Sequence, residues 1–131
     1  MRITYDYQIF GKQRYGGISR YFNEIANIMP SIEGDSVEIF SPLYINEYIE
    51  PSTTTIVSGT KISASPITRL VAKLVNTSLT CLRSHVRRNT DIFHETYYSM
   101  LGCAPRSARR VVTVYDMIHE RLPDSFSHRD I

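Results

Sequence analysis

The chain has 131 residues, of which 42% are hydrophobic and 21% are charged, and its formal net charge is +2. This length and composition predict one globular domain with a sizeable core and exclude a disordered chain. The net charge is too small to indicate a nucleic-acid partner, and no apolar run approaches the ~18 residues of a membrane span.

The first half of the chain alternates between strand and helix patterns. Residues 2–6 predict a strand, and residues 18–29 carry apolar side chains at helical spacing, which predicts a helix that ends at Pro30. Residues 36–41 alternate again and predict a strand stopped by Pro42. Between them and the second half, residues 43–49 suggest a short helix and residues 53–57 a strand before Gly59.

The second half continues the alternation. Residues 67–88 show a helical period with an apolar stripe and an opposite basic stripe from Arg69 to Arg87, and Ser65-Pro66 is a suitable helix start. Residues 91–93 predict a short strand, and the β-branched run 111–114 predicts a buried parallel strand. Together these elements predict an α/β fold, a three-layer Rossmann-like sandwich with a mostly parallel sheet.

Three polar segments are expected where ligands bind in such folds, beyond the carboxyl ends of the strands. They are Gly16-Gly17, His94-Glu95 and Tyr115-Asp116. The two glycines precede a helix, so they allow a phosphate to approach backbone N–H groups at the positive end of the helix dipole. A tight strand-to-helix turn is the alternative for the glycines. His94 suits a general base and Asp116 a hydrogen-bond acceptor for a sugar hydroxyl, although each also suits an ordinary loop position.

Other chemistries find little support in the sequence. The four histidines lack the spacing of a metalloprotease site, so we expect no metal. No Walker motif, dinucleotide fingerprint or nucleophile elbow occurs. Cys81 and Cys103 form no Cys-x-x-Cys motif and indicate no disulfide framework. The first residues lack the pattern of a secretory signal, so we expect a cytoplasmic protein with reduced thiols.

Three motifs resemble those of group 1 glycosyltransferases, the family 4 retaining enzymes with the GT-B fold. The first opens the chain with Gln13-Arg14-Tyr15-Gly16-Gly17-Ile18-Ser19-Arg20-Tyr21-Phe22. The second is Asp91-Ile92-Phe93-His94-Glu95-Thr96-Tyr97-Tyr98, and the third is Val111-Val112-Thr113-Val114-Tyr115-Asp116-Met117-Ile118-His119-Glu120. They occur in the family's order and together cover most of the chain outside residues 43–88.

The resemblance implies that residues 1–131 are a truncated amino-terminal, acceptor-side domain, without the donor-binding domain. It implies a donor-phosphate role for Gly16 and Gly17, catalytic roles for His94, Tyr115 and Asp116, and acceptor contacts for Arg20, Glu95, Tyr98 and Glu120. It further implies transfer of a sugar from a nucleotide-sugar to a glycan, lipid-linked or small acceptor, with no metal or other cofactor. Tyr115 replaces the family's histidine, and a tyrosine is a poor proton acceptor near neutral pH.

We expect the chain to be inactive alone, because the family's acidic E-x7-E region has no counterpart here. Two alternatives stay open: a non-catalytic sugar- or phosphate-binding module, and one subunit of a split glycosyltransferase. We also expect self-association through apolar surface left uncovered. The basic stripe of residues 67–88 allows peripheral contact with the inner face of a membrane, although a solvated basic face is the more common meaning of such a stripe.

Overall fold

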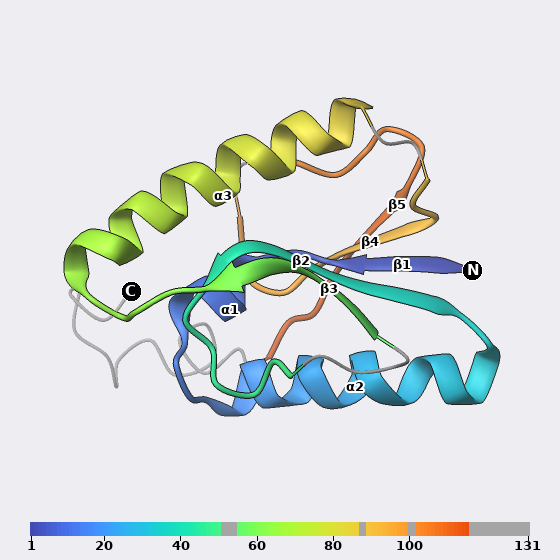
Figure 1. The fold of residues 1–131 in the computed structure, drawn as a ribbon. Coiled ribbons are helices and arrows are strands. Elements are labelled where there is room, and N and C mark those ends of the chain that lie inside the picture. Colours follow the sequence, from blue (N-terminus) through green and yellow to red (C-terminus); the bar gives the residue numbers. More distant parts are fainter. Residues whose placement is uncertain (51–54, 87–88, 100–101, 116–131) are drawn as a thin grey trace, which may run out of the picture.

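Residues 1–50, 55–86, 89–99 and 102–115 are described in the computed structural model. Five parallel strands form one sheet in the order β3-β2-β1-β4-β5 (Figure 1). Their bounds are β1 Arg2–Tyr5, β2 Ser36–Tyr44, β3 Thr55–Lys61, β4 Ile92–Glu95 and β5 Arg109–Val112. Helix α2 (Gly17–Glu33) covers one face of the sheet, helix α3 (Pro66–Val86) covers the other, and the short helix α1 (Gln8–Lys12) follows β1. The expected three-layer α/β sandwich is confirmed.

The apolar core lies between the sheet and α2. Strand side chains alternate between the two faces, and Ile3 and Tyr5 of β1 and Val37 and Ile39 of β2 belong to this core. The ring of Tyr5 lies 5.5 Å from that of Phe22 on α2. The fully enclosed members of this core are Ile9, Phe10, Phe22, Ala26, Val37 and Ile39.

Helix α2 continues through Pro30, so the expectation that it ends there is wrong. A proline in a helix leaves the carbonyl four residues earlier without its N–H partner. Here the hydroxyl of Thr55 donates to the Ala26 carbonyl at 2.7 Å and replaces the missing donor. The helix instead ends at Glu33 and is capped by Gly34, whose φ of 65° is the left-handed conformation that glycine adopts without strain.

Strand β2 likewise continues through Pro42, and the expected short helix over residues 43–49 is absent. The pairing of β2 with β3 shifts register between Phe40 and Leu43, and such an irregularity is where a strand tolerates proline. Strand β3 also continues past Gly59. A Cβ on Gly59 would lie 1.7 Å from the Ser41 carbonyl oxygen, so this close approach requires glycine.

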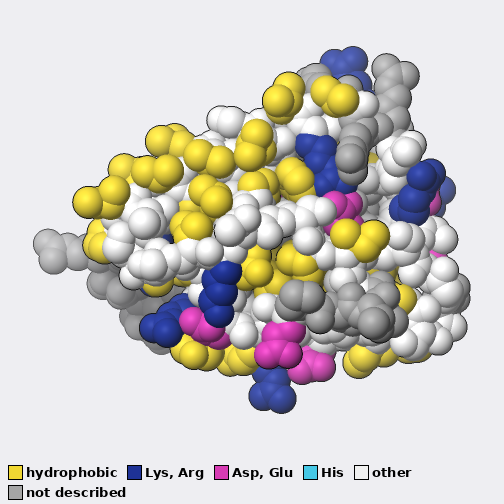
Figure 2. Space-filling view, in the orientation of Figure 1, with side chains coloured by type: hydrophobic (Ala, Val, Ile, Leu, Met, Phe, Trp, Pro, Cys, Tyr) yellow, Lys and Arg dark blue, Asp and Glu magenta, His cyan; other side chains and the backbone are white. Residues whose placement is uncertain are grey.

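Helix α3 confirms the predicted helix over residues 67–86, and residues 87–88 lie outside the described residues, but its apolar stripe faces outward. Among its described side chains, Ala72, Asn76 and Thr80 are buried, whereas most of the large aliphatic ones are exposed, from Ile67 at 76% to Val86 at 73%. Figure 2 shows hydrophobic side chains gathered along this helix. The reason lies in the sheet, whose α3-facing side carries polar groups that need polar partners. Arg83 forms a bidentate ion pair with Glu38, and Thr4 shares a hydrogen bond with Thr90 below the helix.

The last two strands differ from the sequence expectation. His94 and Glu95 belong to β4 rather than following it, and they pair with Val111 and Val112 of β5. Strand β5 is exposed along its length because it lies at the edge of the sheet, so the expected buried strand is wrong. Cys81 and Cys103 form a disulfide with a Cα–Cα distance of 4.7 Å, which corrects the expectation of unpaired thiols.

Candidate functional site

The sheet has a topological switch point between β1 and β4. After β1, the chain passes through α2 to β2, which neighbours β1 on one side in the sheet. It later passes through α3 to β4, which neighbours β1 on the other side. In open parallel sheets, the carboxyl ends of the two strands at such a point form the usual ligand crevice. Here those ends lead into residues 6–12, which contain α1, and into residues 96–98.

Asp6 and Thr96 join the ends of the two strands. Asp6 is only 3% exposed, and its carboxylate accepts the Thr96 N–H at 2.9 Å and the Thr96 hydroxyl at 2.6 Å. It also accepts the side-chain amide of Gln8 at 2.6 Å, and the Thr96 hydroxyl accepts the Ile9 N–H at 3.1 Å. Burial raises the pKa of Asp6, although the bonds from Thr96 and Gln8 oppose this shift. The bonds hold α1 against the end of β4 and give the crevice a fixed wall.

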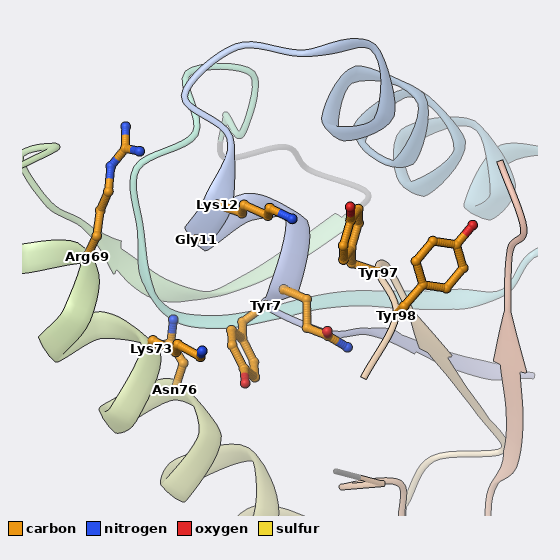
Figure 3. A pocket seen from close by; sticks show the side chains of 9 residues that line it. Tyr7, Gly11, Lys12, Arg69, Lys73, Asn76, Tyr97 and Tyr98 are labelled. Atoms are coloured by element: carbon orange, nitrogen blue, oxygen red, sulfur yellow. The ribbon is translucent and has the colours of Figure 1, made fainter. Parts of the chain in front are cut away.

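A cavity of about 390 Å³ opens beside this wall (Figure 3). Side chains from three segments line it: the α1 segment, the first half of α3, and the residues after β4. They are Tyr7, Gln8, Gly11, Lys12, Arg69, Lys73, Asn76, Tyr97 and Tyr98. Its size lies within the range of small-molecule sites.

Three cations surround the cavity. Lys12 places its Nζ 3.8 Å from the centre of the Tyr97 ring, a cation–π contact. Arg69 and Lys73 extend from α3 on the opposite side of the cavity in Figure 3. Among the described residues, none of these three cations forms a salt bridge. Within the described residues, the positive charge around the cavity is therefore not offset by ion pairs, and it suits an anionic ligand.

The tyrosines add flat apolar surfaces and hydroxyl groups. The Tyr7 hydroxyl lies 2.6 Å from the Thr77 hydroxyl, and burial raises the pKa of Tyr7. The Tyr98 hydroxyl accepts the N–H of Tyr115 at 3.1 Å. The two hydrogen bonds hold both phenols in place beside the cavity, and the raised pKa keeps Tyr7 protonated near neutral pH.

His94 and Tyr115 lie near each other on the α2 side of the sheet. Phe22 of α2 contacts both, with ring centroids 5.1 Å from His94 and 6.1 Å from Tyr115. His94 Nε2 lies 2.9 Å from the Thr113 hydroxyl, and burial lowers the pKa of His94. The Tyr115 hydroxyl donates to the Thr96 carbonyl at 3.0 Å, and burial raises the pKa of Tyr115. A neutral His94 is suited to accept or donate a hydrogen bond, but neither residue lines the cavity.

The remaining sequence-predicted residues have other surroundings. Glu95 is buried and pairs with Arg110 at 2.7 Å, which raises the pKa of that guanidinium. Arg20 lies on the exposed side of α2, 3.8 Å from Glu24. Of the predicted site residues that the structure describes, Tyr98 alone lines the cavity. Asp116 and Glu120 lie outside the described residues, so their predicted roles stay predictions.

Gly16 and Gly17 stand at the start of α2, as expected, but away from the cavity lining. The Gln13 side chain accepts the Ser19 N–H at 3.3 Å and so occupies part of this helix terminus. Gly16 has an extended backbone with a φ of 171°, and a Cβ on Gly17 would meet nothing within 4 Å. Local geometry alone therefore does not require glycine at Gly17, and the phosphate role of the pair stays a prediction.

Sequence reasoning did not single out the cavity cations as a site. Lys12 had no assigned role, and Arg69 and Lys73 belong to the basic stripe that the sequence predicted for residues 67–88. Their position in the chain could have indicated them, because the first turns of a helix that follows a parallel strand lie at the carboxyl edge of the sheet.

Comparisons with known proteins identify no relative: no family model, no curated protein and no solved structure matches the chain. Within the described ranges, no group of histidine, cysteine and carboxylate side chains is arranged to hold a metal ion. The fold therefore defines the class of this protein: it is an α/β protein with a Rossmann-like parallel sheet.

Proposed function

We propose that this chain is the acceptor-side part of a retaining glycosyltransferase, which transfers a sugar from a nucleotide-sugar to a glycan, lipid-linked or small acceptor. The observation that carries the proposal is the cavity at the switch point, with its tyrosines and its unpaired Lys12, Arg69 and Lys73. Tyrosine faces and amide side chains suit a sugar ring and its hydroxyls, while the cations suit a phosphate or carboxylate on it. The acceptor is then an acidic or phosphorylated sugar.

In this proposal the donor is held by a separate domain, and the cavity binds and orients the acceptor. Gly16 and Gly17 at the start of α2 would face the donor diphosphate, whose departure is helped by backbone N–H groups and basic side chains. The near neighbours His94 and Tyr115 would stand between the two sites and supply hydrogen bonds to the reacting sugars.

A second candidate is a binding module without catalysis. One observation favours it: among the residues that the structure describes, neither a carboxylate nor a histidine lines the cavity, so none of them can act there as a carboxylate or histidine general base. Binding would then be the whole function of the site. The product of the complete reading frame separates the two candidates, because transfer of labelled sugar from a nucleotide-sugar supports the transferase and binding without transfer supports the module.

Calorimetric titration of the 131-residue chain with glucose 1-phosphate tests the cavity as the acceptor site. We expect Lys12→Gln and Lys73→Gln each to weaken binding about tenfold, a loss of about 1.4 kcal/mol. Lys61→Gln is the matched control, because Lys61 pairs with Glu47 outside the cavity lining. Uncharged glucose should bind more weakly than its phosphate. Equal affinities for all three variants and the unaltered chain would rule out the cavity.

A further inference from the structure

The outer face of α3 is an apolar surface without cover in the described structure. Leu70, Leu74 and Leu82 are 62%, 63% and 62% exposed, and Ile67 and Val86 at the two ends are more exposed still. The stripe runs the length of the helix, about 30 Å at 1.5 Å per residue. Figure 2 shows the corresponding hydrophobic side chains along α3. A surface of this extent marks an interaction site.

This exposure follows from how α3 is anchored. Asn76 donates to the Leu43 carbonyl at 2.7 Å and accepts the Leu43 N–H at 2.8 Å. One turn further along the helix, Thr80 is buried, and two turns further Arg83 pairs with Glu38. The polar side of the helix therefore faces the sheet, and rotating the apolar side inward would break these bonds.

The apolar surface continues beyond the helix. Toward the carboxyl end of α3, a groove of about 510 Å³ lies between the helix and strands β2 and β3. Leu79, Leu82 and Val86 line one side, and Phe40 and Pro42 line the other. The groove gives the surface depth as well as length.

Basic side chains outnumber acidic ones around the surface, and only Arg83 and Lys61 of the described basic residues near it are paired, with Glu38 and Glu47. Helix α3 contains no acidic residue, and the sequence has none between Glu50 and Asp91. Over the same stretch it carries six Lys and Arg residues, of which Arg69 and Lys73 flank Leu70 and Leu74. A helix with an apolar face and basic flanks matches the interface of an anionic bilayer. A second copy would instead bring two such basic helices together.

We propose that the apolar face of α3 docks on an anionic phospholipid bilayer, with the helix lying along the interface. No described helix is long and apolar enough to cross a membrane. Because Arg69 and Lys73 also line the cavity, docking brings the cavity close to the lipid headgroups. The docking proposal stands on the helix itself and does not depend on the proposed transferase activity.

Co-sedimentation of the chain with extruded vesicles tests the proposal. We expect binding to phosphatidylcholine vesicles that contain phosphatidylglycerol, weaker binding to phosphatidylcholine alone, and a loss of affinity as salt is added. The double variant Leu70→Gln and Leu74→Gln should reduce the partition coefficient at least tenfold. Neither leucine lines the cavity, so this variant should still bind glucose 1-phosphate if the acceptor proposal is correct.

The matched control is Ile28→Gln and Ile32→Gln on α2, two aliphatic side chains that are 51% and 67% exposed on a different helix. It should bind vesicles as the unaltered chain does. Circular dichroism verifies that both double variants are folded. Absence of vesicle binding, or equal binding by the leucine variant, overturns the proposal. A second result would also overturn it: the unaltered chain forms a dimer in sedimentation and binds no vesicles, and the leucine variant is a monomer. The apolar face would then be covered by a second copy of the chain.

Discussion

Asn76 should contribute more to stability than any exposed residue of α3. It is only 1% exposed, and its side-chain amide forms two hydrogen bonds to the backbone of Leu43. Replacing Asn76 with alanine removes both bonds and leaves the N–H and C=O of Leu43 without these partners. The helix would then lose the contact that holds its first half against β2.

The magnitude follows from the two bonds. Each contributes about 1 kcal/mol net, and a partly buried group left unpaired adds to the cost, so Asn76→Ala should lower the free energy of unfolding by about 2–3 kcal/mol. At about 2.1 cal/mol/K of unfolding entropy per residue, this corresponds to a decrease in Tm of about 7–11 °C for the chain. Asn76→Asp should be at least as destabilising, because a second oxygen would then face the Leu43 carbonyl.

Thermal unfolding followed by circular dichroism, with urea unfolding as a second measure, gives both quantities. Ser78→Ala is the control, since Ser78 is an exposed residue of the same helix, and its effect should stay within about 0.5 kcal/mol. A Tm for Asn76→Ala within about 2 °C of the unaltered chain would refute the reasoning, because α3 would then be anchored by something other than this amide.

Two further predictions concern the other layers of the fold. Burial lowers the pKa of His94 from 6.5 in the folded state. Just below pH 6.5 the unfolded state therefore binds more protons at this residue than the folded state does. The free energy of unfolding should then fall as the pH drops through 6.5 toward the pKa of the folded state. His94→Gln should flatten this part of the profile, measured by urea unfolding between about pH 7.5 and 5, and an unchanged slope would contradict a buried neutral His94. Gly59→Ala should lower the free energy of unfolding by about 2–3 kcal/mol, because the new Cβ would overlap the Ser41 carbonyl oxygen and push strand β3 away from strand β2. A Gly59→Ala chain as stable as the parent in urea would mean that β2 and β3 do not approach so closely.

The periodicity of residues 67–88 predicted the helix but not its orientation. Periodicity tells which side chains share a face of a helix, and it does not tell which face packs inward. The orientation depends on the sheet, where Glu38 and Thr4 face α3 and need polar partners. That information lies in the register of β1 and β2, outside the helix.

Local rules for proline failed twice for a similar reason. Pro30 and Pro42 are ordinary stop signals for a helix and a strand. A hydroxyl from Thr55 replaces the missing donor in α2, and a register shift accommodates Pro42 in β2. Both compensations come from residues far along the chain, so a local pattern does not contain them.

Of the candidate site, the sequence indicated the right edge of the sheet but few of the residues. Tyr98 was predicted, whereas Lys12, Arg69 and Lys73 were not. The sequence shows these cations as separate polar positions, and only the strand order β2-β1-β4 brings the start of α3 next to α1. The resemblance to glycosyltransferases pointed to His94 and Tyr115, which lie on the α2 side of the sheet.

The central claim is that ligands bind at the switch point between β1 and β4. Titration of the isotope-labelled chain with glucose 1-phosphate, followed by backbone amide NMR, tests it most directly. The account predicts saturable shifts confined to the amides of residues 7–12, 69–76 and 96–98, with Gly16 and Gly17 unaffected. Shifts centred on Gly16 and Gly17, or no saturable shift in the cavity segments, would contradict it.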